Sequence, residues 1–142
     1  MEICGILAEY NPFHNGHKYQ IDLLRKAGVT HVVAFMSGNF VQRGDIAITD
    51  KFTRAKYAVQ NGVDLVIEMP TLYTVASAHF YAKAAYSLMQ DMGCIDAVSF
   101  GCEISDIEIL KKAASFSEEV NESLEIKEKI RTCSQVNTQN TS

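Results

Sequence analysis

The sequence lacks the features that mark several classes of protein. It has no tryptophan, only two prolines in 142 residues, and no apolar run that approaches the length of about 18 residues needed for a transmembrane helix. No basic segment followed by a long apolar run stands near its amino terminus, so a secretory signal peptide is not expected. We therefore expect a cytoplasmic protein with no membrane partner.

Cysteines are few and their spacing is uninformative. The four cysteines are Cys4, Cys94, Cys102 and Cys133, and no two of them form a CxxC pair. Tetrahedral zinc sites and disulfide frameworks depend on closer or more regular spacing. We therefore expect no protein-bound metal, and we expect reduced, mostly buried thiols.

Charge and composition are ordinary for a globular protein. The net charge is −4, with 47% hydrophobic and 21% charged residues. The net negative charge does not indicate a nucleic-acid partner, so any nucleic-acid-binding surface has to be a local basic patch. The length predicts one domain, which we place at residues 1–131, and the polar, aperiodic residues 132–142 predict a disordered tail.

Apolar runs and helical patterns alternate along the chain. The apolar runs cover residues 3–7, 31–36, 63–68 and 97–100, and the helical patterns cover 17–27, 51–61, 72–92 and a segment that begins near 105. A repeated strand–helix order of this kind predicts an α/β protein with a Rossmann-like parallel sheet and helices on both faces. Ligands of such sheets bind beyond the carboxyl ends of the strands.

A histidine pair follows the first predicted strand. The order His14-Asn15-Gly16-His17 places two imidazoles where a loop becomes a helix. Free N–H groups and the helix dipole favour a phosphate there, and two imidazoles can stabilise a phosphoryl group as its charge develops. Spacing alone is equally compatible with a capped helix start that carries two surface histidines.

A glycine follows the fourth predicted strand at the same edge of the sheet. Gly101 comes directly after the apolar run 97–100. Because a glycine lets the backbone approach a ligand closely, this position suits a nucleobase or a ribose. Two glycine-bearing loops that converge on one edge predict a nucleotide pocket.

Three stretches of sequence resemble one family. The HxGH spacing is a signature of the nucleotidyltransferase superfamily. AEYNPFHNGHKYQI, MSGNFVQRGDIAITDKFTRAKYAVQNGVDLVIEMP and SFGCE, taken together, resemble the bacterial tRNA(Met) cytidine acetate ligase family. The resemblance covers roughly residues 1–115 and implies an ATP-dependent enzyme.

The resemblance implies a reaction, its partners and its residues. Members activate acetate as acetyl-adenylate, release pyrophosphate, and transfer the acetyl group to N4 of the wobble cytidine of elongator tRNA(Met). ATP, Mg²⁺, acetate and tRNA are therefore the expected cofactors and partners, with His14 and His17 as catalytic residues. The expected ATP-binding residues are Leu7, Ala8, Glu9, Tyr10, Asn11, Pro12, Phe13, His14, Asn15, Gly16, His17, Lys18, Tyr19, Gln20 and Gly101.

Three cations are candidates for RNA contacts. Arg43 lies in the long loop after the second strand, and Lys51 and Arg54 lie on the helix that follows. They are the first places to look for phosphate contacts if the partner is tRNA. A helix face that is simply solvated remains the ordinary interpretation of such a group.

Two other functions stay open at the level of sequence. Family members are much longer, and their second triphosphate-binding motif, which contains serine and arginine, is absent from these 142 residues. A small-molecule adenylyltransferase of the same fold is one alternative, and a non-catalytic nucleotide-binding fragment is another. An uncovered sheet edge would also permit a homo-oligomer.

Overall fold

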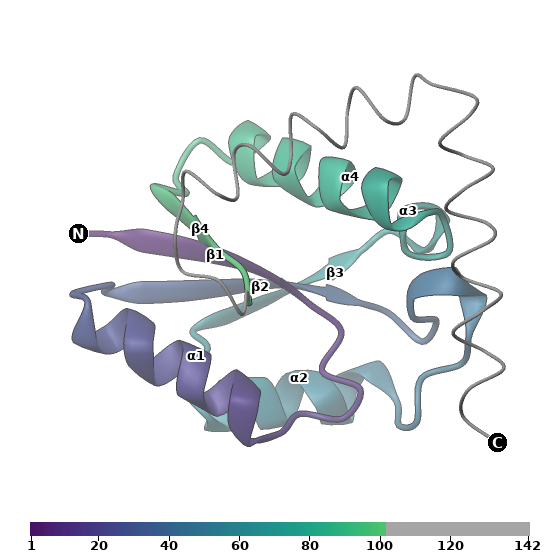
Figure 1. Cartoon of the computed structure of the whole chain (residues 1–142), viewed down its shortest axis with the longest axis horizontal. Coiled ribbons are helices and arrows are strands. Elements are labelled where there is room, and N and C mark those ends of the chain that lie inside the picture. The colour runs from purple at the N-terminus through teal and green to yellow at the C-terminus, as the bar shows by residue number, and fades with distance from the viewer. Residues whose placement is uncertain (102–142) are drawn as a thin grey trace, which may run out of the picture. The chain divides into compact units, whose positions relative to one another are not determined.

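The computed structural model describes residues 1–101, which form one parallel β-sheet with helices on both faces (Figure 1). The predicted boundary at residue 131, the polar tail and the helix near residue 105 lie outside the described residues. Along the chain the elements are β1 (Ile3–Ala8), α1 (Asn15–Lys26), β2 (His31–Ser37), the short 3-10 turn η1 (Gln42–Gly44), α2 (Lys51–Gln60), β3 (Leu65–Met69), α3 (Thr71–Thr74), α4 (Ala78–Asp91) and β4 (Ala97–Ser99).

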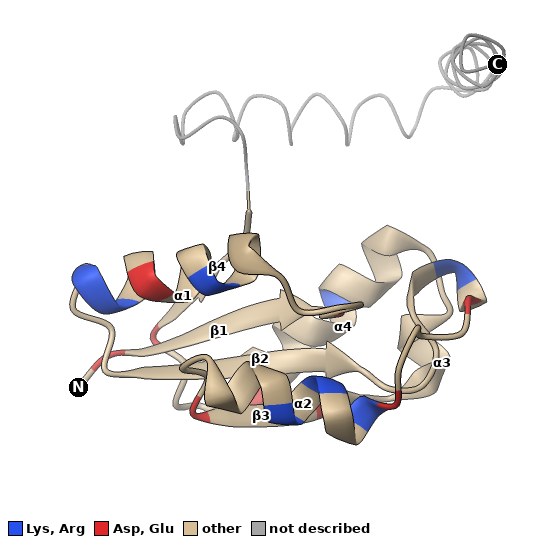
Figure 2. Ribbon diagram, turned by 90° about the horizontal axis from the view of Figure 1, so that it is seen from below, with Lys and Arg blue, Asp and Glu red and all other residues tan. Residues whose placement is uncertain are grey.

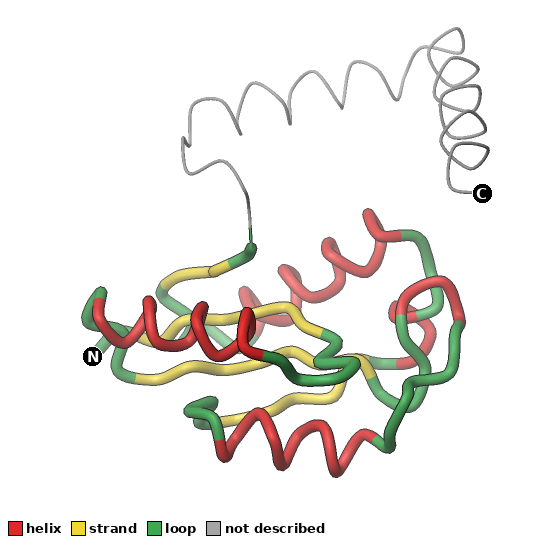
Figure 3. Tube along the Cα trace, turned by 60° about the horizontal axis from the view of Figure 1, so that its bottom comes forward, coloured by secondary structure: helices red, strands yellow, loops and turns green. Residues whose placement is uncertain are grey.

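The strand order is β3-β2-β1-β4, and every pair is parallel. The chain moves outward from β1 through β2 to β3 and then returns to the other side of β1. The direction of winding therefore reverses at β1, which is the point where α/β sheets bind ligands. The loops that follow β1 and β2 gather at one end of the sheet (Figure 3).

Two apolar clusters pack against the sheet, one on each face. The first joins β1 and β2 to α1 and α2 through residues such as Ile21 and Ala58. The second joins β2 and β3 to α4 through Phe35, Tyr81 and Met89. The predicted α/β class with helices on both faces is confirmed. None of the helices within residues 1–101 has the length and apolarity that crossing a membrane requires.

Several predicted boundaries and positions were wrong in detail. The helix predicted over 72–92 is divided into α3 and α4, and the buried residues of α4 are Tyr81, Ala85 and Met89. The prediction of mostly buried thiols holds for Cys4 but not for Cys94, which is exposed. The helix restarts after Ser77, so the phase of its apolar face differs from that of one continuous helix.

Arg54 is not available to RNA, which corrects the prediction that it contacts RNA. The residue is fully buried, at 0% exposure. Its guanidinium donates to the backbone carbonyls of Glu9, Ser37, Gly38 and Thr49, which lie just after β1, at the end of β2, just after β2 and before α2. Helical periodicity misses this role because the carbonyls that need donors come from distant parts of the chain.

We expect Arg54→Met to lower the free energy of unfolding by about 3 kcal/mol or more, since two buried and two partly buried carbonyls would lose a charged donor. Urea unfolding followed by circular dichroism measures the change. Lys56→Met is the matched control, because Lys56 is an exposed cation on the same helix. Equal stability of the two variants would contradict the structural role of Arg54.

Candidate nucleotide site

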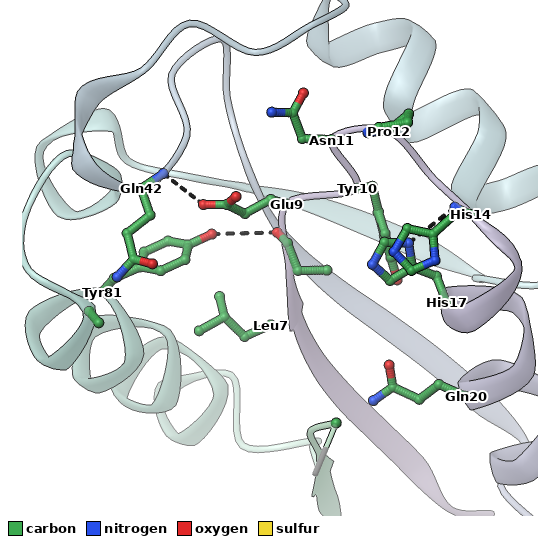
Figure 4. Close-up of a pocket in the computed structure, with 13 residues that line it drawn as sticks. Leu7, Glu9, Tyr10, Asn11, Pro12, His14, His17, Gln20, Gln42 and Tyr81 are labelled. Carbon is green, nitrogen blue, oxygen red and sulfur yellow. Dashed lines mark hydrogen bonds between the residues drawn. The ribbon is translucent and has the colours of Figure 1, made fainter. Parts of the chain in front are cut away.

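A cavity of about 590 Å³ opens at the carboxyl end of β1, where the sheet topology predicts a ligand (Figure 4). This volume lies in the range of small-molecule sites. The lining combines the end of β1 and the loop that follows it with residues of α1, η1 and α4 and with the residue that lies two positions after β4. The lining residues are Leu7, Ala8, Glu9, Tyr10, Asn11, Pro12, His14, His17, Gln20, Gln42, Ala78, Tyr81 and Gly101.

The two histidines cap the start of α1. His14 is the N-cap residue, and its Nδ1 accepts a hydrogen bond from the Gly16 N–H at 3.1 Å. In return, Nδ1 of His17 accepts from the His14 N–H at 3.2 Å. This reciprocal arrangement is a capping box in which imidazole replaces the usual hydroxyl and carboxylate. The helix thus starts two residues earlier than predicted.

Gly16 is required by the way His14 folds over the helix end. A Cβ at position 16 would lie 2.9 Å from Cε1 and 3.1 Å from Nδ1 of His14. Any larger residue would therefore displace the imidazole or lose its bond to the helix. This contact gives a physical reason for glycine between the two histidines.

The capping bonds also fix which nitrogen carries the proton. A neutral imidazole has one donor and one acceptor nitrogen, and Nδ1 of both rings accepts. His14 and His17 therefore carry their protons on Nε2, which leaves two N–H donors for a ligand. The rings stack with centroids 3.7 Å apart, and His17 also packs edge-on against Tyr10 at 4.9 Å.

Burial keeps His17 neutral near pH 7. Its pKa is lowered from the ordinary value of 6.5, mainly by desolvation and secondarily by the charge of His14. Tyr10, which packs against it, is 1% exposed, and burial raises its pKa to about 12. The aromatic surroundings thus hold a neutral donor at the mouth of the helix.

The opposite wall of the cavity is polar and comes from three elements. Oε1 of Glu9 accepts from the Gln42 N–H at 2.6 Å, and the Tyr81 hydroxyl donates to the Ala8 carbonyl at 3.4 Å. Asn11 ties the same loop to the β2–α2 connection by accepting from the Ile48 N–H. Figure 4 shows Glu9 directed toward Gln42 and Tyr81, away from the imidazole pair.

The structure brings most of the predicted ATP-binding residues to one cavity, but not all of them. Gln20 also lies there, held by a bond from its Nε2 to Oγ of Ser99 at 2.9 Å. Lys18 forms an ion pair with Asp22 and, with Phe13 and Asn15, lines a separate cavity beside α2. Gly16 is not part of the lining, but its lack of a side chain leaves room for the His14 ring. Tyr19 is 64% exposed and lies outside the lining.

Sequence reasoning missed three residues of the lining, namely Gln42, Ala78 and Tyr81. The long loop after the second predicted strand gave no indication of which of its residues lines the site. Ala78 and Tyr81 lie on α4, which was predicted as part of one longer helix. A break in the helical pattern at Ser77 was the signal that could have indicated the start of α4.

The remaining candidate cations lie outside the cavity lining. Arg43 is exposed in η1, where its φ of 72° places it in the left-handed region. Lys51 at the start of α2 pairs with Glu68, at 2.6 Å. Within residues 1–101 no group of three acidic, histidine or cysteine side chains is placed to hold a metal ion.

The fold and this site define a class of protein. A parallel sheet whose switch point carries an HxGH helix start is the arrangement of an α/β nucleotidyltransferase. The sequence model of the HIGH Nucleotidyl Transferase family matches residues 1–140. The chain therefore belongs to the HIGH nucleotidyltransferase family.

Its relatives are more specific in name. The chain is 49% identical over 127 residues to the tRNA(Met) cytidine acetate ligase of Alkaliphilus metalliredigens, covering 89% of this chain and 30% of the relative. Identity to the Clostridium tetani ligase is 45% over 132 residues, covering 92% and 32%. The chain thus spans about a third of these relatives' length.

A solved structure of the same kind is similar. Thermotoga maritima TmcAL, bound with alpha-thio ATP, superimposes with a TM-score of 0.77 at 41% identity. The match covers 84% of this chain and 29% of that one. The predicted fold class and the predicted resemblance are both confirmed.

We expect His17 to make stability depend on pH. The unfolded chain binds a proton at the ordinary value of 6.5, whereas the folded chain resists it, so the free energy of unfolding falls as the pH drops below about 6.5. His17→Gln should remove this part of the dependence while its amide oxygen keeps the capping bond. Urea unfolding at a series of pH values measures it.

The matched control is His79→Asn, which changes an exposed histidine on α4. Its pH dependence should follow that of the unaltered chain. If His17→Gln shows the unaltered slope as well, the depressed pKa of His17 is not the cause.

Proposed function

We propose that this chain is the ATP-activating part of a tRNA(Met) cytidine acetate ligase. In this reaction the acetate carboxylate attacks the α-phosphorus of ATP, pyrophosphate leaves, and acetyl-adenylate forms. The acetyl group then passes to N4 of a cytidine in tRNA. The observation that carries the proposal is the pair of Nε2 donors held at the helix start, in a cavity at the switch point of the sheet.

The imidazole pair suits the phosphates of ATP. Both Nδ1 atoms are occupied by backbone N–H groups, so His14 and His17 present Nε2–H to the cavity. Donors that are fixed before the reaction stabilise charge as it develops, without a reorganisation cost. The dipole of α1 adds a favourable field for an anion at the same place.

The other end of the nucleotide has open backbone beside it. A Cβ on Gly101 would meet no described atom within 4 Å, and Gln20 holds α1 against β4 nearby. This open surface supports the prediction that the ribose or base lies along Gly101. We include Mg²⁺ as an ion that is bound by the phosphate oxygens of ATP and by water, since Mg²⁺ usually keeps several waters.

RNA binding is a further part of the proposal, with Arg43 and Lys51 as its phosphate contacts. Both belong to the β2–α2 region, and Figure 2 shows basic residues on α2 and on the loop that precedes it. Arg54 is excluded from this role by its burial. We also propose that acetate is the acyl donor. The expected cytoplasmic location and a homo-oligomer are part of the same proposal.

We expect the double variant His14→Asn, His17→Gln to bind MgATP about 100-fold more weakly, because two hydrogen bonds to a charged ligand are lost. Both replacements can still cap a helix start, so the fold should persist. Calorimetry measures the affinity, with His79→Asn as the control. Undiminished binding by the double variant would place the triphosphate elsewhere, and no binding by the unaltered chain would contradict ATP activation by it.

We expect Arg43→Ala and Lys51→Ala each to weaken RNA binding and to reduce the slope of log affinity against log salt by about 0.7. Fluorescence anisotropy with a single-stranded anticodon-loop RNA measures both quantities. Lys26→Ala is the control, because Lys26 lies in the last turn of α1, at the other end of that helix from the cavity. A slope that changes only in the control variant would move the RNA to another face.

A further inference from the structure

Glu9, which the family resemblance places among the ATP-binding residues, has a position in the cavity that the anionic groups of ATP and acetate do not explain. It is the only carboxylate among the described lining residues, and it stands on the wall opposite the imidazole pair. A carboxylate repels both phosphate and acetate, so neither anion is stabilised by a place beside it. The ligand that fits this wall has a hydrogen-bond donor.

The carboxylate is held firmly and remains partly free. Oε1 of Glu9 accepts from the Gln42 N–H at 2.6 Å. The backbone carbonyl of Glu9 accepts from the buried guanidinium of Arg54. Among the described residues, no donor is bonded to Oε2. Glu9 therefore presents one preorganised acceptor oxygen to the cavity.

An exocyclic amine is the donor that matches this oxygen. Carboxylates accept from the N4 amine of cytosine, the one amine that this base carries. Leu7 and the side chains of Ala78 and Tyr81 give the rest of this wall an apolar and aromatic surface suited to a base. The two halves of the cavity thus suit two ligands, a triphosphate beside the histidines and an amine-bearing base beside Glu9.

We propose that Glu9 forms the acceptor subsite: its carboxylate binds the N4 amine of a cytosine and takes the proton released on acylation. This inference rests on the proposed function. The amine nitrogen attacks the carbonyl carbon of acetyl-adenylate and forms the C–N bond. The C–O bond to the phosphate breaks, its electron pair leaves with AMP, and the amine proton passes to Oε2 of Glu9.

Tyr81 is the other titratable side chain on this wall. Its hydroxyl donates to the Ala8 carbonyl, and burial, helped by the charge of Glu9, raises its pKa. Tyr81 therefore stays protonated and acts as a wall of the subsite. The proton acceptor is Glu9.

The test is Glu9→Gln, which keeps an acceptor for the Gln42 N–H but removes the basic carboxylate. Three quantities are measured: MgATP binding, acetate-dependent exchange between ATP and pyrophosphate, and transfer of labelled acetate to an RNA hairpin with an unpaired cytidine. We expect binding and exchange to be retained and transfer to fall about 100-fold or more. The same hairpin with uridine, which lacks the amine, should accept nothing.

Two further variants complete the test. Glu2→Gln removes an exposed carboxylate outside the cavity and should behave as the unaltered chain in all three assays. Glu9→Asp keeps the carboxylate one methylene shorter and should transfer faster than Glu9→Gln. If Glu9→Asp transfers acetate no faster than Glu9→Gln, the role of the carboxylate is overturned. The role is also overturned if circular dichroism shows Glu9→Gln to be unfolded while Glu9→Asp is folded and inactive in transfer.

The remaining outcomes separate this inference from the proposed function. Full transfer by Glu9→Gln overturns the acceptor subsite alone. Loss of ATP binding or exchange in that variant assigns Glu9 to the nucleotide and also overturns it. Exchange without transfer by the unaltered chain overturns the acceptor assignment, whereas no exchange overturns the proposed function and this inference with it.

Discussion

The buried guanidinium of Arg54 is the constraint on which the described site depends. It is 0% exposed, yet it donates to carbonyls just after β1, at and just after the end of β2, and before α2. Parallel strands end with unpaired carbonyls at the ligand edge of a sheet, and such groups are costly to bury without donors. One planar cation with five N–H groups satisfies several at once. The position of Glu9, and through it the polar wall of the cavity, follows from this arrangement.

The second constraint is local and belongs to the HxGH sequence itself. The imidazoles of His14 and His17 use their Nδ1 atoms to cap α1, and the absence of a side chain at Gly16 gives His14 its place. Structure and chemistry are coupled here, because the capping bonds determine the tautomer and so aim Nε2–H at a ligand. A motif that marks a superfamily in sequence is therefore also a device for starting a helix. The two interpretations that the spacing left open, a helix cap and a phosphate site, are compatible.

The sequence predicted the fold well because its main signals are local. Continuous apolar runs marked the buried strands, and α2 begins where its predicted helical pattern begins, with the Asp50 side chain as its N-cap. The errors arose where distant segments meet. Arg54 looked like a solvent-facing cation, since its partners lie 16, 17 and 45 residues away in the chain. Gln42 and Tyr81 reach the cavity only through the folding of the β2–α2 loop and the restart of α4, which periodicity does not encode. The histidine side of the cavity could be predicted from the HxGH spacing and the family resemblance. The Gln42 and Tyr81 side could be recognised only in the folded structure.

We propose that the His14 and His17 imidazoles are neutral Nε2–H donors that meet the phosphates of ATP. Nitrogen-15 NMR of the two rings tests it most directly, with spectra recorded before and after MgATP is added. We expect the Nε2–H tautomer for both rings in the free chain and a change in both Nε2 signals on binding. Protons on Nδ1, or Nε2 signals that stay in place while ATP binds, would contradict it.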